Sequence, residues 1–171
     1  NFLLIGIRNI IRLNQMKKNR ILELWQNNKV CLNGWLSIPN SFTAEAMSKM
    51  GWDSITIDMQ HGQNDYSSSI SMLQAIANSN TIPFARVPWN EPGIIMKMLD
   101  LGVMGIIAPM INSKRECENF VSYCNYPPIG QRSFGPMRAQ LIYDSDYYDN
   151  DDYNNYDDYD DFDDYDDYDD F

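Results

Sequence analysis

Short apolar runs alternate with amphipathic stretches along residues 16–143, and this alternation predicts the secondary structure. Each apolar run is at most eight residues long and ends at a turn-forming residue, which is typical of buried strands. We expect strands at 31–38, 54–59, 83–87 and 105–110. Apolar residues at helical spacing, with Ser41 as a cap and Pro92 in a first turn, predict helices at 19–27, 41–50, 68–77, 92–101 and 113–123.

This β-α repeat predicts an α/β fold, a parallel sheet covered by helices, because apolar strands at this spacing must be buried on both faces. An open doubly wound sheet and a (β/α)8 barrel both satisfy the pattern. No GxGxxG follows the first strand, which weakens the dinucleotide-binding version of the open sheet. Polar residues gather where strands end, at 58–61, at Arg86 and at 109–112, and barrel enzymes keep their chemistry at those ends.

Charge divides the chain into three zones. The net charge is −11 over 171 residues, but residues 144–171 hold 15 Asp and no Lys or Arg, so residues 1–143 carry +4. The acidic balance argues against a nucleic-acid partner, and no apolar stretch is long enough to span a membrane. We expect a leader or untranslated extension at 1–15, a partial barrel at 16–143 and a disordered Asp/Tyr tail at 144–171.

The three cysteines, Cys31, Cys117 and Cys124, show neither a CxxC pair nor a zinc spacing. An odd number without such a pattern predicts buried, reduced thiols. Reduced thiols favour a cytoplasmic location, with an organelle matrix as the alternative because residues 1–15 weakly resemble a transit peptide.

His61, the only histidine, follows the strand at 54–59 and precedes Gly62. It is either an ordinary loop residue or a general base, the role for which imidazole is best suited near neutral pH. A base needs a partner that fixes its tautomer, and Asp100, at the end of the helix at 92–101, is the candidate.

Arg86 lies within the apolar run FARVPW, where an unpaired charge is unfavourable. Its guanidinium fork would suit a carboxylate or enolate oxygen, or it forms a structural salt bridge with Asp58 or Glu91.

Trp35, on the first strand, is either a core residue or part of a pocket wall. Arg132 and Arg138, in a loop with several glycines and prolines, could hold an anion or form a solvated connection.

Five segments together resemble the HpcH/HpaI aldolase family. They are GWL at 34–36, IDMQHG at 57–62, ARVPWN at 85–90, LDLG at 99–102 and GQRSFGP at 130–136. The similarity runs in order from residue 19 to 143. It implies a (β/α)8 barrel and a class II aldolase, which cleaves a 4-hydroxy-2-oxo acid to pyruvate, or a close 2-oxo acid, and an aldehyde.

The resemblance also implies roles for single residues. His61 matches the catalytic histidine, Asp100 the aspartate that pairs with it, and Arg86 the arginine that holds the pyruvate oxygen and steadies the enolate. Trp35 matches a pocket tryptophan, and Asp58 matches an acidic residue near the site. A divalent metal, Mg, Mn or Co, would chelate the 2-oxo acid as a Lewis acid.

In the family, the metal-binding glutamate and aspartate lie beyond the matched region, so we expect no metal ligands in this chain. Homo-oligomers are implied for complete barrels, an expectation that does not extend to half a barrel. We therefore expect the N-terminal half of an aldolase barrel of about four β-α units. The alternative is an inactive barrel fragment whose acidic tail binds basic partners.

Overall fold

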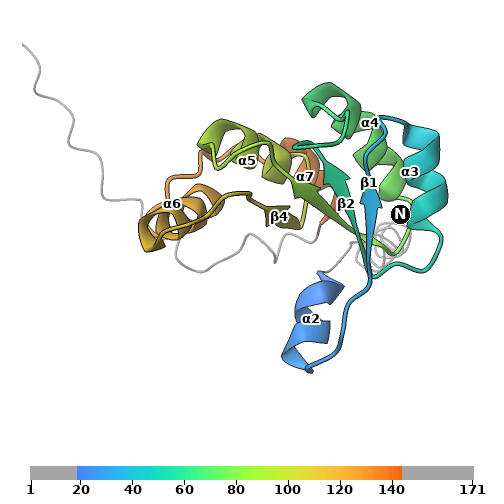
Figure 1. The fold of residues 1–171 in the computed structure, drawn as a ribbon, viewed down its shortest axis with the longest axis horizontal. Helices are drawn as coiled ribbons and strands as arrows, with labels where there is room; N and C mark the ends of the chain where they lie inside the picture. Colours follow the sequence, from blue (N-terminus) through green and yellow to red (C-terminus); the bar gives the residue numbers. More distant parts are fainter. Residues whose placement is uncertain (1–18, 144–171) are drawn as a thin grey trace, which may run out of the picture.

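The computed structural model of the chain describes residues 19–143 (Figure 1). Within them four strands form one parallel sheet in the order β1-β2-β3-β4. The strands are β1 (Asn33–Leu36), β2 (Ser54–Asp58), β3 (Ile82–Arg86) and β4 (Gly105–Ile107). The predicted α/β class and the four strand positions are confirmed, although β1 and β4 are shorter than the apolar runs that contain them. The predicted leader at 1–15 and tail at 144–171 lie outside the described residues.

The strand order distinguishes the two architectures that the sequence left open. A doubly wound sheet reverses its order at a switch point, whereas a barrel adds each new strand beside the previous one. Here every strand pairs with its neighbour in sequence, with Gly34 beside Ile55, Ile57 beside Ala85, and Ala85 beside Ile106. The order is that of one half of a (β/α)8 barrel.

Helices connect the strands, and most begin at a side chain that caps their free N–H groups. They are α2 (Arg20–Gln26), α3 (Ser41–Ser48), α4 (Tyr66–Ile76), α5 (Pro92–Asp100), α6 (Lys114–Cys124) and α7 (Met137–Ile142). The prediction of Ser41 as the cap of α3 is wrong, because the side chain of Asn40 accepts from the Thr43 N–H. Helix α4 begins before residue 68 because Asp65 and Ser68 form a capping box. Helix α7 is an addition to the predicted set.

The two faces of the sheet differ in character because side chains alternate along each strand. Leu36, Ile55, Ile57 and Ala85 lie on one face and join the buried cluster that contains Ala44 of α3 and further apolar residues of α4 and α5. The other face carries Trp35, Thr56, Phe84 and the polar residues described below. The helices therefore cover one face, which becomes the outer face of a barrel, and the polar face is the inner one.

A smaller cluster closes the sheet at the amino ends of its strands. Ile21 of α2 is buried against Ile82, Met104 and two residues of the α7 region, Ala139 and Tyr143. The Asn19 side chain donates to the Met104 carbonyl, which ties the start of α2 to the segment that leads into β4. The carboxyl ends of the strands lie at the opposite end of the sheet from this cluster, and the candidate site lies there.

Among residues 19–143, no helix is both long enough and apolar enough to cross a membrane.

The three thiols are free, as the sequence predicts. Their predicted burial is wrong for Cys117, which is exposed on α6, while Cys31 and Cys124 are partly buried.

Candidate functional site

Asp58, the last residue of β2, is the centre of the site. The residue is 2% exposed, and its carboxylate accepts five hydrogen bonds. Arg86 donates through Nε to Oδ1 at 2.8 Å and through Nη2 to Oδ2 at 2.6 Å. The Trp35 indole N–H donates to Oδ2 at 3.1 Å, and the backbone N–H groups of Gln60 and His61 donate to Oδ1. The carboxylate thus joins three strand ends and the loop that carries His61.

These contacts fix the position of the Arg86 guanidinium. Asp58 holds it by two parallel hydrogen bonds, and its central carbon lies 4.9 Å from the Trp35 ring centroid, within cation–π range. Of the two open interpretations of Arg86, the structural ion pair with Asp58 is present, whereas Glu91 instead caps α5 through the Gly93 and Ile94 N–H groups. Nη1 of Arg86 makes no hydrogen bond to any residue within 19–143, so the same group retains donors for an anion.

The ionisation of Asp58 follows from these contacts. Burial raises the pKa of the carboxyl, but the hydrogen bonds from Arg86, Trp35, His61 and Gln60 together lower it more. The net result is a pKa well below the usual range of an aspartate. Asp58 also raises the pKa of Arg86. At neutral pH the pair is therefore an ionised carboxylate and a guanidinium, and Asp58 is not a proton donor.

His61 is exposed, on the loop between β2 and α4. Its backbone N–H bonds to Asp58, while its imidazole makes no hydrogen bond to a residue that the structure describes. Gly62 allows the loop to turn closely over the strand ends, because a Cβ there would lie 2.3 Å from the Asp58 carbonyl oxygen. The loop thus brings the imidazole to the same sheet edge as Arg86 and leaves it open to solvent.

Asp100 has a partner other than the one the sequence suggested. Arg132 donates to its carboxylate at 2.8 Å, and the described residues give no contact between Asp100 and His61. Arg132 is 6% exposed and its guanidinium carbon lies 4.5 Å from the centroid of the Tyr126 ring. Arg132 is therefore packed against the end of α5, whereas Gln131, Ser133, Phe134 and Gly135 of the same loop are exposed, as a solvated connection would be.

A divalent cation would need several oxygen or nitrogen ligands in one place. Among residues 19–143, no three His, Cys, Asp or Glu side chains come together in that way. Asp58 is the carboxylate at the centre of the site, and its two oxygens are engaged by five donors. The described half of the fold does not fit the metal that the resemblance implies.

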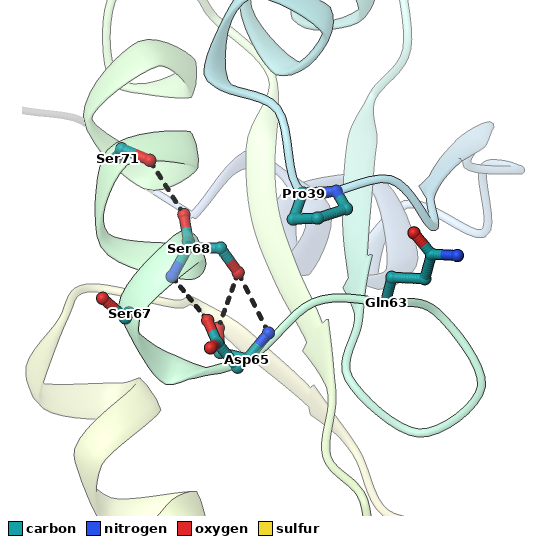
Figure 2. A pocket seen from close by; sticks show the side chains of 6 residues that line it. All are labelled: Pro39, Gln63, Asp65, Ser67, Ser68 and Ser71. Atoms are coloured by element: carbon teal, nitrogen blue, oxygen red, sulfur yellow. Dashed lines mark hydrogen bonds between the residues drawn. The ribbon is translucent and has the colours of Figure 1, made fainter.

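An open hollow of about 470 Å³ lies beside the start of α4 and is separate from the Asp58 cluster. Its lining residues are Pro39, Gln63, Asp65, Ser67, Ser68 and Ser71. Figure 2 shows that three of these residues are bonded to one another: Ser68 and Asp65 form the capping box, and Ser71 donates to the Ser68 carbonyl. No residue of the predicted site lines the hollow.

Sequence reasoning missed Asn64, and it named Arg132 without foreseeing its partner Asp100. Asn64 donates to the carbonyl oxygens of Leu36 and Asp58, and Arg132 holds Asp100. The Asn64–Leu36 bond and the Arg132–Asp100 bond join segments that are distant in sequence, whereas the Asn64–Asp58 bond is local. One feature of the sequence could have pointed to Asn64: it lies at the end of the strand-to-helix loop that also carries His61.

The fold and the site together define a class of protein. It has half of a parallel β/α barrel, with a fixed arginine and a histidine at the carboxyl ends of the strands. The family model of the HpcH/HpaI aldolase/citrate lyase family matches residues 33–155, and the chain belongs to this family.

Two curated relatives and one solved structure illustrate the match. A hydroxypyruvate/pyruvate aldolase of Rhizorhabdus wittichii is 42% identical over 129 residues, 75% of this chain and 51% of the relative. A 4-hydroxy-2-oxo-heptane-1,7-dioate aldolase of Salmonella dublin is 32% identical over 72% of this chain and 47% of its own length. An HpcH/HpaI aldolase/citrate lyase family protein of Burkholderia cenocepacia has a TM-score of 0.68 at 31% identity, covering 73% of this chain and 52% of that structure.

The chain spans about half the length of the curated relatives it matches. This agrees with the four-stranded, half-barrel sheet of the described residues.

Proposed function

We propose that this chain carries the 2-oxo acid-binding part of an aldolase site, for cleavage of a 4-hydroxy-2-oxo acid to pyruvate, or a close 2-oxo acid, and an aldehyde. The observation that carries the proposal is the Arg86 guanidinium, fixed at the strand ends by Asp58 and Trp35. The relatives' names support the substrate class, since they include pyruvate, hydroxypyruvate and a 4-hydroxy-2-oxo acid.

Arg86 would act as the anion clamp. Two of its nitrogens are held by Asp58, so the group has little freedom to lose when a ligand binds. Nη1 is the nitrogen that remains for a carboxylate or for the oxygen of an enolate. A donor fixed in advance stabilises charge that develops during bond cleavage more effectively than water does.

His61 would move the proton. In the cleavage direction it accepts the proton of the C4 hydroxyl while the C3–C4 bond breaks. The electron pair of that bond then forms the enolate of the 2-oxo acid, and protonation at C3 gives pyruvate. An exposed imidazole on the loop bonded to Asp58 supports this role because a base must reach substrate at the same edge as Arg86. A general base contributes about 10²- to 10⁴-fold in rate.

The sequence assigned Asp100 to orient His61, and that role remains a proposal. Within this chain Asp100 is bonded to Arg132. To pair with His61, the Asp100 carboxylate would have to bond to both residues at once or to leave Arg132. The family resemblance implies a divalent cation as Lewis acid, and no step above is assigned to it because the described residues do not form its site.

The test is exchange of the C3 protons of pyruvate in D₂O, followed by proton NMR and carried out both with and without added Mn²⁺ or Co²⁺. We expect exchange with the chain and a loss of about 100-fold or more in His61→Ala. Gln60→Ala is the matched control, since Gln60 contributes only its backbone N–H to Asp58. Arg86→Lys should weaken pyruvate binding, because lysine cannot keep both bonds to Asp58 and still present a fixed donor.

The alternative, an inactive barrel fragment with an acidic interaction tail, predicts the opposite result. It gives no exchange with or without metal, and salt-sensitive binding of basic partners that is lost when residues 144–171 are deleted. Exchange that persists in His61→Ala would contradict the role of His61 while leaving the substrate class open.

A further inference from the structure

Asn64 lies in the loop between β2 and α4, directly before the Asp65 cap, and is 6% exposed. Its side-chain amide donates to two carbonyl oxygens, that of Leu36 at 2.9 Å and that of Asp58 at 2.9 Å. Leu36 is the last residue of β1 and Asp58 is the last residue of β2. A single amide group thus bridges the carboxyl ends of two adjacent strands.

These two strand ends carry the groups that hold Arg86. Trp35 immediately precedes Leu36, and its indole N–H reaches Asp58 Oδ2 at 3.1 Å. Asp58 supplies both oxygens to Arg86. A change in the separation of the strand ends would therefore alter the indole–carboxylate bond and the direction of the guanidinium together.

The loop is fitted closely enough to fix Asn64. A Cβ at Gly62 would lie 3.1 Å from Asn64 Nδ2 and 3.0 Å from the Ser37 Cα. The backbone N–H of Gln63 also donates to the Ser37 carbonyl at 2.9 Å, one residue beyond β1. Asn64 Oδ1 is buried without a hydrogen-bond partner among the described residues, so the side chain acts here through its two N–H donors.

We propose that Asn64 is a positioning residue: by bridging the Leu36 and Asp58 carbonyls it sets the Trp35–Asp58–Arg86 geometry. Its importance for 2-oxo acid binding rests on the proposed function, but its effect on the geometry does not. The substitution that isolates the effect is Asn64→Asp, which keeps the shape of the side chain and replaces both N–H donors by an oxygen.

The Trp35 indole N–H provides a direct readout. In a ¹H–¹⁵N spectrum of the full chain, Trp35→Phe identifies its signal among those of Trp25, Trp35, Trp52 and Trp89. We expect Asn64→Asp to move the Trp35 indole proton upfield, because its bond to Asp58 weakens, and to leave the Trp89 signal in place. Asn40→Asp is the matched control: it makes the same chemical change at the α3 cap, where the side-chain oxygen that accepts from Thr43 is retained.

Asn64→Ser, which keeps one donor and adds no charge, tests the same point in case Asn64→Asp does not fold, and should give a smaller upfield shift. If either folded variant keeps the wild-type Trp35 signal, the proposal is wrong. If both variants lose the far-UV circular dichroism of the wild type, Asn64 is a general stability residue and the proposal is also wrong.

A second readout links the geometry to the reaction. In the folded variant the KM for pyruvate exchange should rise by about tenfold, the equivalent of one weakened hydrogen bond, with a smaller change in kcat. If the wild type gives no exchange, the proposed function fails, while the Trp35 signal still decides whether Asn64 positions the cluster.

Discussion

The Asp58 carboxylate receives more hydrogen bonds than a neutral side chain of the same shape could accept. An asparagine there would keep one acceptor oxygen and present an N–H₂ group to the Arg86 and Trp35 donors. Arg86 would then lie partly buried without its counter-charge. Removing one member of a buried ion pair is strongly destabilising because the other charge stays behind.

We therefore expect Asp58→Asn to lower the free energy of unfolding by about 3 kcal/mol or more. Urea denaturation at pH 7 followed by circular dichroism measures the loss. Glu45→Gln is the control, because its pair with Lys49 is exposed on α3 and should contribute less than about 0.5 kcal/mol. Similar losses in the two variants would contradict the central role of Asp58.

The same carboxylate predicts a pH dependence. The pKa of Asp58 in the folded chain lies below that of an unfolded aspartate, which is about 3.9. Its contribution to stability is therefore fully present above about pH 5 and is lost as the pH falls through the unfolded pKa toward that of the folded state. The difference in unfolding free energy between wild type and Asp58→Asn should shrink between pH 5 and about pH 3, measured by urea denaturation at each pH. A difference independent of pH would show that the ionised form of Asp58 is not what stabilises the fold.

Part of this residue chemistry was accessible from the sequence. An arginine in an apolar strand needs a carboxylate. Asp58, at the end of the preceding strand, and Glu91 were the two candidates, so the Arg86–Asp58 pair was foreseeable but not unique, although the two residues are 28 positions apart. The Asp100–Arg132 pair and the Asn64–Leu36 bridge join positions 32 and 28 residues apart, and each involves a loop residue that no strand pairing places. Such contacts depend on how the elements pack, which local patterns do not determine.

At the scale of elements, strong local signals gave correct predictions. The apolar strands and the proline at the start of α5 were identified, as was the helix predicted at 113–123, which the structure shows as α6 with Ser113 as its cap. Helix α7 is six residues long and has no side-chain cap, so nothing local marks it, and it is held by packing against Ile21, Ile82 and Met104. Helix α3 begins at Ser41 as predicted, but its cap is Asn40. Helix α4 begins at Tyr66, before the predicted start at residue 68, because Asp65 is its cap.

Helix α6 is packed unevenly, and its two thiols should report this. Cys124, near its carboxyl end, packs against the main core, and burial raises the pKa of its thiol to about 11 despite the opposing effect of Arg132. Cys117, two turns earlier, is exposed. Because the thiolate is the reactive form, we expect iodoacetamide at pH 8 to label Cys117 much faster than Cys124, by at least tenfold.

Both cysteines lie in one tryptic peptide, residues 116–132. Tandem mass spectrometry of this peptide over a time course assigns the label to Cys117 or Cys124 by fragmentation and so measures both rates in one sample. The control is the same reaction in urea, where burial is removed and the two rates should converge. Equal rates in the native chain would mean that the carboxyl end of α6 is not packed as described.

At the scale of the whole molecule, the site is assembled at the carboxyl ends of the strands, from the ends of three strands and one loop. Asp58 holds Trp35, Arg86 and the His61 loop together, and Asn64 bridges two of the strands beneath them. The polar inner face also includes Phe84, whose ring lies so close to Gly105 that a Cβ there would be 2.5 Å away. The sheet is therefore closely packed at this point on its inner face, because only a glycine at position 105 leaves room for the Phe84 ring.

The same architecture leaves β1 and β4 each paired on one side only, within the residues that the structure describes. Unpaired strand edges bind other strands, and charged residues at an edge suppress this. Val30 and Leu32, which lead into β1, are 85% and 60% exposed and add apolar surface beside that edge. We expect the chain to self-associate as its concentration rises, with β1 as one of the contact edges.

Sedimentation velocity over a series of concentrations measures this association. Leu32→Lys should reduce it, because a lysine beside β1 opposes pairing with another strand. Met50→Lys is the matched control: it adds the same charge at a residue that is 70% exposed and lies after α3, outside the strands. An equal reduction in both variants would assign the effect to net charge, and a chain that stays monomeric at every concentration would show that its sheet edges are protected in solution.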